Sequence, residues 1–268
     1  MARQRMGQHF LRDLGWRKRI LATLPRDNND TWIEIGAGHG EMTELLAANG
    51  RRVVAIEGDP KLAEGLREKT ASSSAGWAGV TVVAGGVLEQ DFRALAGGQR
   101  FRVYGNLPYY ITSPILHRLF DYAGQIDSIH LVIQLEVAER IVAQPGRREY
   151  GYLSAACQFY TKPRIALRLP PGAFSPPPKV KSALVEMNLP GERARLNIGD
   201  ARNETRFLEF VQSCFSQKRK TLRNNLRADS SEEQIHSALT ETGLRLDARA
   251  EQLSLPQFAE IFRQLKLL

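Results

Sequence analysis

The sequence contains little that could form a disulfide bond or hold a metal ion. It has two cysteines, Cys157 and Cys214, and five histidines among 268 residues. The cysteines lie far apart, and neither belongs to a C-x-x-C or Cys/His spacing, so we expect two buried thiols. The histidines are scattered, and their spacing suggests neither a ligand cluster nor a Ser/His/Asp constellation. We therefore expect no metal cofactor.

Long apolar runs are also absent. The longest apolar segments have the length of a strand, far short of the ~20 residues that a membrane-spanning helix needs. Residues 1–5 lead into no apolar signal segment. The sequence therefore predicts a cytoplasmic protein that has no membrane partner.

Acidic residues are fewer than basic ones. The chain has 37 Lys and Arg against 29 Asp and Glu, a formal net charge of +8. Basic side chains that neutralise phosphates release condensed counterions, so this balance favours a polyanionic partner. Nucleic acid is the first expectation, and an anionic membrane surface is a distant second.

Strand-like and helix-like segments alternate over the first part of the chain. This alternation predicts a parallel sheet in an α/β domain. The strands are expected at residues 31–35, 52–56, 80–83, 101–104 and 128–134, and the helices at residues 41–49, 61–70, 113–122 and 136–142.

The pattern changes toward the end of the chain. Two further strands are expected at residues 164–169 and 182–189, on either side of a loop that is too rich in proline for regular structure. Beyond Pro190 and Gly191 only helices are expected, at residues 204–215, 217–227, 232–242 and 255–267. We therefore expect a catalytic domain over residues 1–189 and a small all-helical domain over residues 190–268.

The most informative segment is N-L-P-Y at residues 106–109, directly after a strand-like run. The exocyclic amine of adenine is a poor nucleophile because its lone pair is delocalised into the ring. The Asn106 amide oxygen and the Leu107 carbonyl could accept its two protons, and Pro108 would turn that carbonyl into a pocket. Tyr109 would stack on the base, a contact of about 1–3 kcal/mol. Taken alone, the tetrapeptide is as often a proline turn with a buried tyrosine.

Three glycines follow the first expected strand at intervals of two residues. Gly36, Gly38 and Gly40 allow a tight turn and the close approach of a ligand to backbone N–H groups. The spacing lacks the gap of a dinucleotide fingerprint, and Glu34 in the strand would suit a cationic sulfonium better than a phosphate. Glu57, at the end of the second strand, is placed to accept hydrogen bonds from ribose hydroxyls, or else to cap a helix.

These motifs, with several later segments, have the order and spacing found in the ribosomal RNA small-subunit adenine N6-dimethyltransferases (the KsgA/RsmA family), which the chain resembles over nearly its whole length. The resemblance implies a Rossmann-like S-adenosylmethionine-dependent methyltransferase fold. It also implies N6,N6-dimethylation of two adjacent adenosines near the 3′ end of small-subunit ribosomal RNA during late subunit biogenesis. The segments that carry it are Q-H-F-L-R-D at 8–13, E-I-G-A-G-H-G-E-M-T at 34–43, E-G-D at 57–59, N-L-P-Y at 106–109, Q-L-E-V-A-E-R-I at 134–141, F-S-P-P-P-K-V-K-S at 174–182 and K-R-K-T-L-R-N-N-L at 218–226.

The resemblance assigns roles to individual residues. Phe174, in the proline-rich loop, would sandwich the target base against Tyr109, and the surrounding prolines could hold an exposed ring in place at low entropic cost. A phenylalanine in a loop is otherwise often buried in the core. Where the family usually has an Asp that accepts the cofactor's adenine amine, this chain has Gly86, so a backbone group or a water would have to replace that side chain. The residues expected to bind S-adenosylmethionine are His9, Leu11, Gly36, Gly38, Glu57, Gly86 and Asn106.

A basic segment near the C-terminus is the second expected functional element. Its five basic residues lie within ten positions that contain no acid, which is typical of a helix that grips the phosphates of a folded RNA, or of an ordinary solvated helix face. We expect a monomer whose partner is an immature small ribosomal subunit. The expected RNA-binding residues are Lys218, Arg219, Lys220, Arg223 and Arg227.

Three other functions remain open at this stage. An Erm-type enzyme that methylates large-subunit ribosomal RNA has a similar amine motif, although the segments at 174–182 and 218–226 favour the small-subunit family. A ribosome-assembly factor with weak or lost turnover is a second alternative, for which Gly86 is the only indication. A small-molecule amine methyltransferase is the third, and the basic segment argues against it.

Overall fold

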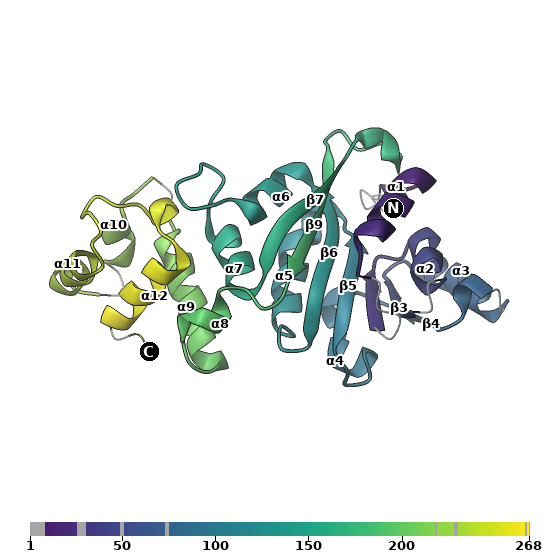
Figure 1. Cartoon of the computed structure of the whole chain (residues 1–268), viewed down its shortest axis with the longest axis horizontal. Helices are drawn as coiled ribbons and strands as arrows, with labels where there is room; N and C mark the ends of the chain where they lie inside the picture. Colours follow the sequence, from purple (N-terminus) through teal and green to yellow (C-terminus); the bar gives the residue numbers. More distant parts are fainter. Residues whose placement is uncertain are drawn as a thin grey trace, which may run out of the picture. The chain divides into compact units, whose positions relative to one another are not determined.

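The computed structural model describes residues 9–25, 31–48, 51–72, 75–217, 219–227, 230–265 and 267. The chain forms two compact units (Figure 1). The first comprises Met1–Ala138 and Pro163–Leu189, and the second comprises Glu139–Lys162 and Pro190–Leu268. The chain thus passes between the units at the expected boundary after residue 189, and also at two earlier points that the sequence pattern did not indicate.

The first unit is built on a seven-stranded sheet with the order β4-β3-β2-β5-β6-β9-β7. Strands β2 to β6 pair in parallel, and β9 runs antiparallel to β6, which confirms the expected α/β fold with a mainly parallel sheet. The strands are β2 (Thr31–Ile35), β3 (Arg52–Glu57), β4 (Val80–Ala84), β5 (Phe101–Asn106), β6 (Ile126–Gln134), β7 (Lys162–Leu169) and β9 (Ser182–Asn188).

The order of the strands creates a crevice beside β2. The chain moves from β2 outward to β3 and β4, then returns to β5 on the other side of β2, and ligands of α/β proteins bind at such a reversal, beyond the carboxyl ends of the strands. Right-handed crossovers that run in opposite directions place their helices on opposite faces. Accordingly, α1 (Leu14–Thr23), α2 (Glu41–Ala47) and α3 (Pro60–Ala71) lie on one side of the sheet and α5 (Thr112–Phe120) on the other (Figure 1).

A short second sheet joins two segments that are far apart in the sequence. Strand β1 (Phe10–Leu11) pairs antiparallel with β8 (Phe174–Ser175), so that Leu11 lies opposite Phe174. The expectation that the proline-rich loop has no regular structure is therefore wrong at Phe174 and Ser175, and also at Pro171–Ala173, which form a short 3-10 helix. At the two strand residues the reason is nonlocal, because their backbone groups pair with the N-terminal segment rather than with a neighbour in the loop.

The second unit is helical. Residues 139–162 belong to it because Phe159 of the first of its helices packs on Phe207, with ring centroids 5.4 Å apart, and Phe207 in turn packs on Phe262. Its helices are α7 (Tyr152–Tyr160), α8 (Arg193–Leu196), α9 (Ala201–Cys214), α10 (Leu222–Leu226), α11 (Glu232–Glu241) and α12 (Leu255–Gln264). Helix α6 (Leu135–Val142) spans the division between the units.

The expected helix at residues 217–227 is wrong over its first half, because α10 begins only at Leu222. The side chain of Asn225 donates a hydrogen bond of 2.6 Å to the Cys214 carbonyl and thereby satisfies the end of α9. Thr221 then caps α10 by accepting from the backbone N–H of Asn224. These two side chains satisfy backbone groups at the end of α9 and at the start of α10, which is why the second helix begins later than expected.

Both cysteines are buried and form no disulfide, as the sequence predicts. Burial in an apolar surround raises the pKa of the Cys157 thiol, so it remains protonated. Within the described ranges, no helix combines the length and the apolar character needed to cross a membrane. Nor does any group of three or more His, Cys, Asp and Glu in the part of the chain that the structure describes have the arrangement of a metal site.

Candidate active site

A pocket of about 300 Å³ opens at the carboxyl ends of the central strands of the first unit. It extends from the N-terminal segment and the loop after β2, past the end of β3 and the loop after β4, to the end of β5. Most of the site residues expected from the sequence line it: His9, Gly36, Gly38, Glu57, Gly86, Asn106, Leu107, Pro108 and Tyr109. Leu11 and Phe174 do not.

The main chain of the loop after β2 is accessible from the pocket. Gly36, Gly38 and Gly40 have φ of 72°, 58° and 83°, in the left-handed region that favours glycine. A Cβ on Gly38 would lie 3.1 Å from the ring of Phe10, and one on Gly40 would lie 2.4 Å from Trp77. Side chains are thus excluded from this turn, and a ligand can reach the main chain.

Glu57 links the loops that follow β2 and β3. One carboxylate oxygen accepts from Gly38 N at 2.7 Å and the other from Asp59 N at 2.9 Å, and the residue is 4% exposed. Each oxygen can accept a further hydrogen bond, so the carboxylate remains able to receive two ribose hydroxyls. Helix α3 is capped by Asp59 instead, which excludes the capping alternative for Glu57.

Glu34 lies on the buried strand β2 and does not line the pocket. The pKa of its carboxyl is raised to about 8, mainly by burial and also by the nearby charges of Glu57 and Glu41, against the opposing effect of a hydrogen bond with Thr43. The group is therefore mostly protonated near neutral pH, in contrast to the anionic surround that the sequence suggested for a cationic ligand. A positive charge brought close to it would favour its ionisation.

The N-L-P-Y segment at residues 106–109, called the amine motif here, is held in place by hydrogen bonds of its main chain and of the Asn106 side chain. Leu107 N donates to Val132 O of β6 at 3.1 Å, which continues the sheet beyond Asn106. The Asn106 side-chain nitrogen donates to the His9 carbonyl at 2.8 Å. This bond orients the amide so that its oxygen faces away from His9. Pro108, with φ of −58°, then turns the chain into a short 3-10 helix that begins at Tyr109.

Tyr109 is half-buried at the same end of the pocket. Its hydroxyl hydrogen-bonds to the Ser182 hydroxyl at 2.9 Å, and its ring lies 5.7 Å from that of His9. Burial raises the pKa of Tyr109, whereas the bond to Ser182 lowers it. Tyr110, which sequence reasoning missed, also lines the pocket and is 65% exposed. The doubled tyrosine of N-L-P-Y-Y was the available signal.

Phe174 lies in the core of the first unit rather than in the pocket. It is 5% exposed and packs in one apolar cluster with Leu11, Trp32 and Leu184. The expectation of an exposed ring, stiffened by prolines, does not fit this arrangement. Pairing of β8 with β1 directs the ring inward, where burial of a large apolar side chain is favourable.

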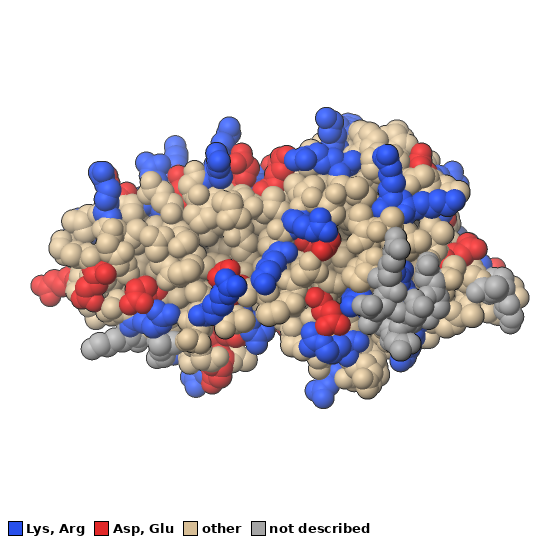
Figure 2. Space-filling view, in the orientation of Figure 1, with Lys and Arg blue, Asp and Glu red and all other residues tan. Residues whose placement is uncertain are grey.

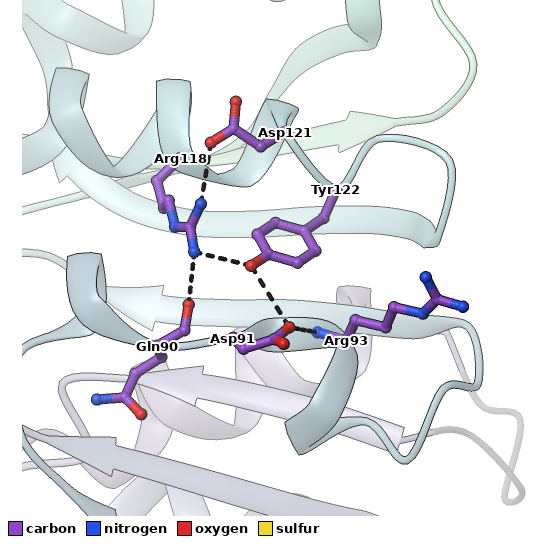
Figure 3. A network of polar contacts seen from close by, with 6 residues as sticks. All are labelled: Gln90, Asp91, Arg93, Arg118, Asp121 and Tyr122. Atoms are coloured by element: carbon purple, nitrogen blue, oxygen red, sulfur yellow. Dashed lines mark hydrogen bonds and ion pairs between the residues drawn. The ribbon is translucent and has the colours of Figure 1, made fainter.

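The loop after β4 carries Gly86 and is braced from α5. Arg118 donates one hydrogen bond of 2.9 Å to the Gln90 carbonyl and one of 2.8 Å to the Tyr122 hydroxyl (Figure 3). Asp91 accepts a longer bond from Tyr122 and caps the short helix α4 (Phe92–Leu95). Sequence reasoning missed Arg118, since nothing local relates it to Gly86.

The basic segment of the second unit has a different form from the one expected. Arg219 and Lys220 are exposed and precede α10, whereas Arg223 and Arg227 both form ion pairs with Glu232 of α11, at 3.5 Å for Arg227. Lys218 lies outside the described residues. On the face of the molecule seen in Figure 2, basic and acidic side chains are interspersed and form no single basic patch.

Sequence comparison relates the whole chain to a known family. The family model described as "Ribosomal RNA adenine dimethylase" matches residues 1–267. A ribosomal RNA small subunit methyltransferase A from Acidobacterium capsulatum is 42% identical over 264 residues, which are 98% of this chain and 90% of that protein. The protein of the same name from Caldanaerobacter subterraneus is 36% identical and covers 100% of this chain and 98% of its own length.

Solved structures agree with the fold. A dimethyladenosine transferase from Plasmodium falciparum superposes with a TM-score of 0.78 at 22% identity, covering 97% of this chain and 98% of that one. The 23S rRNA methyltransferase ErmE has a TM-score of 0.71 at 26% identity, covering 96% and 99%. The likeness to these structures supports a methyltransferase fold, and the sequence matches extend over almost every residue. The chain therefore belongs to the ribosomal RNA adenine dimethylase family.

Proposed function

We propose that this protein transfers methyl groups from S-adenosylmethionine to the exocyclic amines of two adjacent adenosines near the 3′ end of small-subunit ribosomal RNA. The observation that carries this proposal is a single pocket in which the amine motif, led by Asn106, meets the glycine loop and Glu57. The names of the relatives support the small-subunit target over the large-subunit alternative.

The pocket fits an adenosyl cofactor, which supplies the methyl group on a sulfonium. Glu57 would bind the ribose hydroxyls, for which its buried carboxylate has free acceptor sites. Gly36 and Gly38 would lie against the methionine portion, because their lack of side chains allows a ligand to approach the main chain. His9 would form part of the wall at the methyl end of the pocket, beside Asn106.

The amine motif would activate the target nitrogen. The Asn106 oxygen and the Leu107 carbonyl would accept the two amine protons, which localises the lone pair on the nitrogen. Tyr109 would stack on the flipped base and hold it in one plane for in-line attack. The methyl group would pass directly from the sulfonium to the amine nitrogen, so no covalent enzyme intermediate is needed, and the proton released by the methylated amine would pass to solvent.

The second unit would contribute affinity for the RNA rather than chemistry. Arg219 and Lys220, both exposed, are the residues of the basic segment best able to contact phosphates. Recognition of RNA rests largely on shape and phosphate contacts, which suits a folded precursor particle. We infer that the protein acts as a cytoplasmic monomer on immature small subunits.

The test is methyl transfer from tritiated S-adenosylmethionine to purified small subunits that lack adenosine dimethylation, followed by nuclease digestion and identification of the labelled nucleoside. Dimethyladenosine from the 3′ end is the expected product. Large-subunit RNA and free adenosine serve as controls. Label in large-subunit RNA, or unchanged activity of an Asn106→Ala variant, would contradict the proposal.

A further inference from the structure

The pocket has an end that the amine motif does not use. If Glu57 binds the ribose of the cofactor, as the proposed function requires, Asn106 marks the methyl end and the adenine must lie beyond Glu57, at Gly86 and Val87. The side chains of Val87 and Ile115 make this end apolar, which suits the faces of a flat ring. The edge of the ring carries an amine, and that amine needs an acceptor.

The carbonyls of Gly86 and Val87 have little capacity left to accept. Gly86 O already accepts from Glu89 N at 3.2 Å and from the side-chain nitrogen of Gln90 at 3.0 Å, so both of its lone pairs are used. Val87 O accepts from Gln90 N at 3.3 Å. Residue 86, being glycine, has no side chain to offer.

The Glu89 carboxylate lies next to the position at which a side chain of residue 86 would begin. A Cβ built on Gly86 would lie 3.5 Å from Cδ of Glu89 and 3.6 Å and 3.7 Å from its two oxygens. Glu89 ends the 3-10 helix that follows Gly86, which brings residues 86 and 89 together on one side of that turn. Its side chain is exposed, and no hydrogen bond or ion pair engages its carboxylate among the described residues.

We propose that the Glu89 carboxylate accepts a hydrogen bond from the adenine amine of the cofactor, in place of a side chain at residue 86. The bracing of the loop supports this role. Arg118 holds the Gln90 carbonyl, and Gln90 holds Gly86, so the main chain on either side of Glu89 is fixed from α5 (Figure 3). The acceptor is therefore carried on a rigid turn.

The test is calorimetric titration of the full chain with two ligands. S-adenosylhomocysteine carries the amine, whereas S-inosylhomocysteine carries a carbonyl oxygen at the same ring position. The wild-type chain should prefer the adenosyl ligand. Glu89→Ala should weaken binding of that ligand about tenfold, which corresponds to ~1.4 kcal/mol, and should leave the inosyl ligand bound equally well or better.

Two further variants make the result specific. Gly86 has φ of −68° and ψ of 134°, a conformation open to any residue, so Gly86→Asp added to Glu89→Ala should restore affinity for the adenosyl ligand. Glu68→Ala, which removes another exposed acid of the same unit, should bind both ligands as the wild type does.

The outcomes that contradict the inference are distinguishable. If Glu89→Ala weakens both ligands equally, or neither, the inference is overturned while the proposed function stands. If the wild-type chain binds neither ligand, the proposed cofactor is contradicted and this inference falls with it. A normal unfolding transition for each variant shows that any reduction in affinity is local.

Discussion

The pocket of the first unit and the basic segment of the second are both marked by short sequence motifs, yet they relate to those motifs differently. The pocket gathers most of the residues that its motifs single out. The basic segment is a turn and a short helix in which Arg223 and Arg227 are paired with Glu232, an acid outside the motif. A site formed by main-chain groups and strand ends is determined by the residues of its own motifs. The net charge of a surface segment also depends on acidic side chains that are distant in the sequence.

The strongest test of the pocket is Asn106→Ala. Loss of an acceptor that acts on the reacting amine should lower kcat for methyl transfer by about 10²–10³-fold, the range seen when one catalytic hydrogen-bonding group is removed. Affinity for S-adenosylhomocysteine should change much less. Single-turnover transfer to small subunits, together with calorimetric titration, separates the two effects, and equal losses in both would remove the catalytic assignment.

Glu34→Gln tests the buried carboxyl beneath the glycine loop. Its pKa in the folded chain, about 8, exceeds the ordinary value of 4.5, so the folded state binds the proton more tightly than the unfolded state does. The stability that this adds at low pH is lost as pH rises from about 4.5 to about 8, at up to ~1.4 kcal/mol per pH unit. The variant should therefore gain stability over the wild type as pH rises, by several kcal/mol across that window.

Denaturant unfolding of both proteins at several pH values checks this expectation. A constant difference between Glu34→Gln and the wild type from pH 5 to pH 8 would show that Glu34 has an ordinary pKa. Glu68→Gln, an exposed acid of the same unit, is the matched control and should give a difference near zero throughout.

Two aromatic variants decide which ring contacts the base. Tyr109→Ala should weaken productive RNA binding by about 1–3 kcal/mol, the range for one stacked base, and raise KM for small subunits. Phe174→Leu keeps an apolar side chain in the core and should leave KM unchanged while it lowers the free energy of unfolding. If Phe174→Leu raises KM and leaves the free energy of unfolding unchanged, the Phe174 ring contacts the base.

Substitutions in the basic segment are expected to have the smallest effect on RNA affinity, and the effect should differ between its exposed and its ion-paired residues. Replacing the exposed pair, as Arg219→Gln with Lys220→Gln, should reduce the slope of log affinity against log salt by about one for each phosphate that is no longer neutralised. Replacing Arg223 and Arg227 by Gln should change it less, because Glu232 already neutralises part of their charge. Equal slopes for the two double variants would contradict this distinction.

Most of the strands and helices from β2 to α6, and most residues of the pocket, could be predicted because they follow from local periodicity and from motifs at the ends of strands, although α1, α4 and α7 were missed. The positions that differ depend on contacts distant in sequence. Phe174 is buried because β8 pairs with β1, and residues 139–162 join the second unit because Phe159 packs on Phe207. Helix α10 begins later than expected because Asn225 reaches back to the Cys214 carbonyl at the end of α9. None of these contacts leaves a signal in the segment itself.

The two hydrogen bonds of Glu57 have a consequence for the rate of ligand association. Gly38 N and Asp59 N already have an acceptor within the chain, so the loops on both sides of the pocket are preorganised. Their amide protons should exchange slowly with solvent even without ligand. Little loop ordering then remains to slow association, and affinity would be tuned mainly through the dissociation rate.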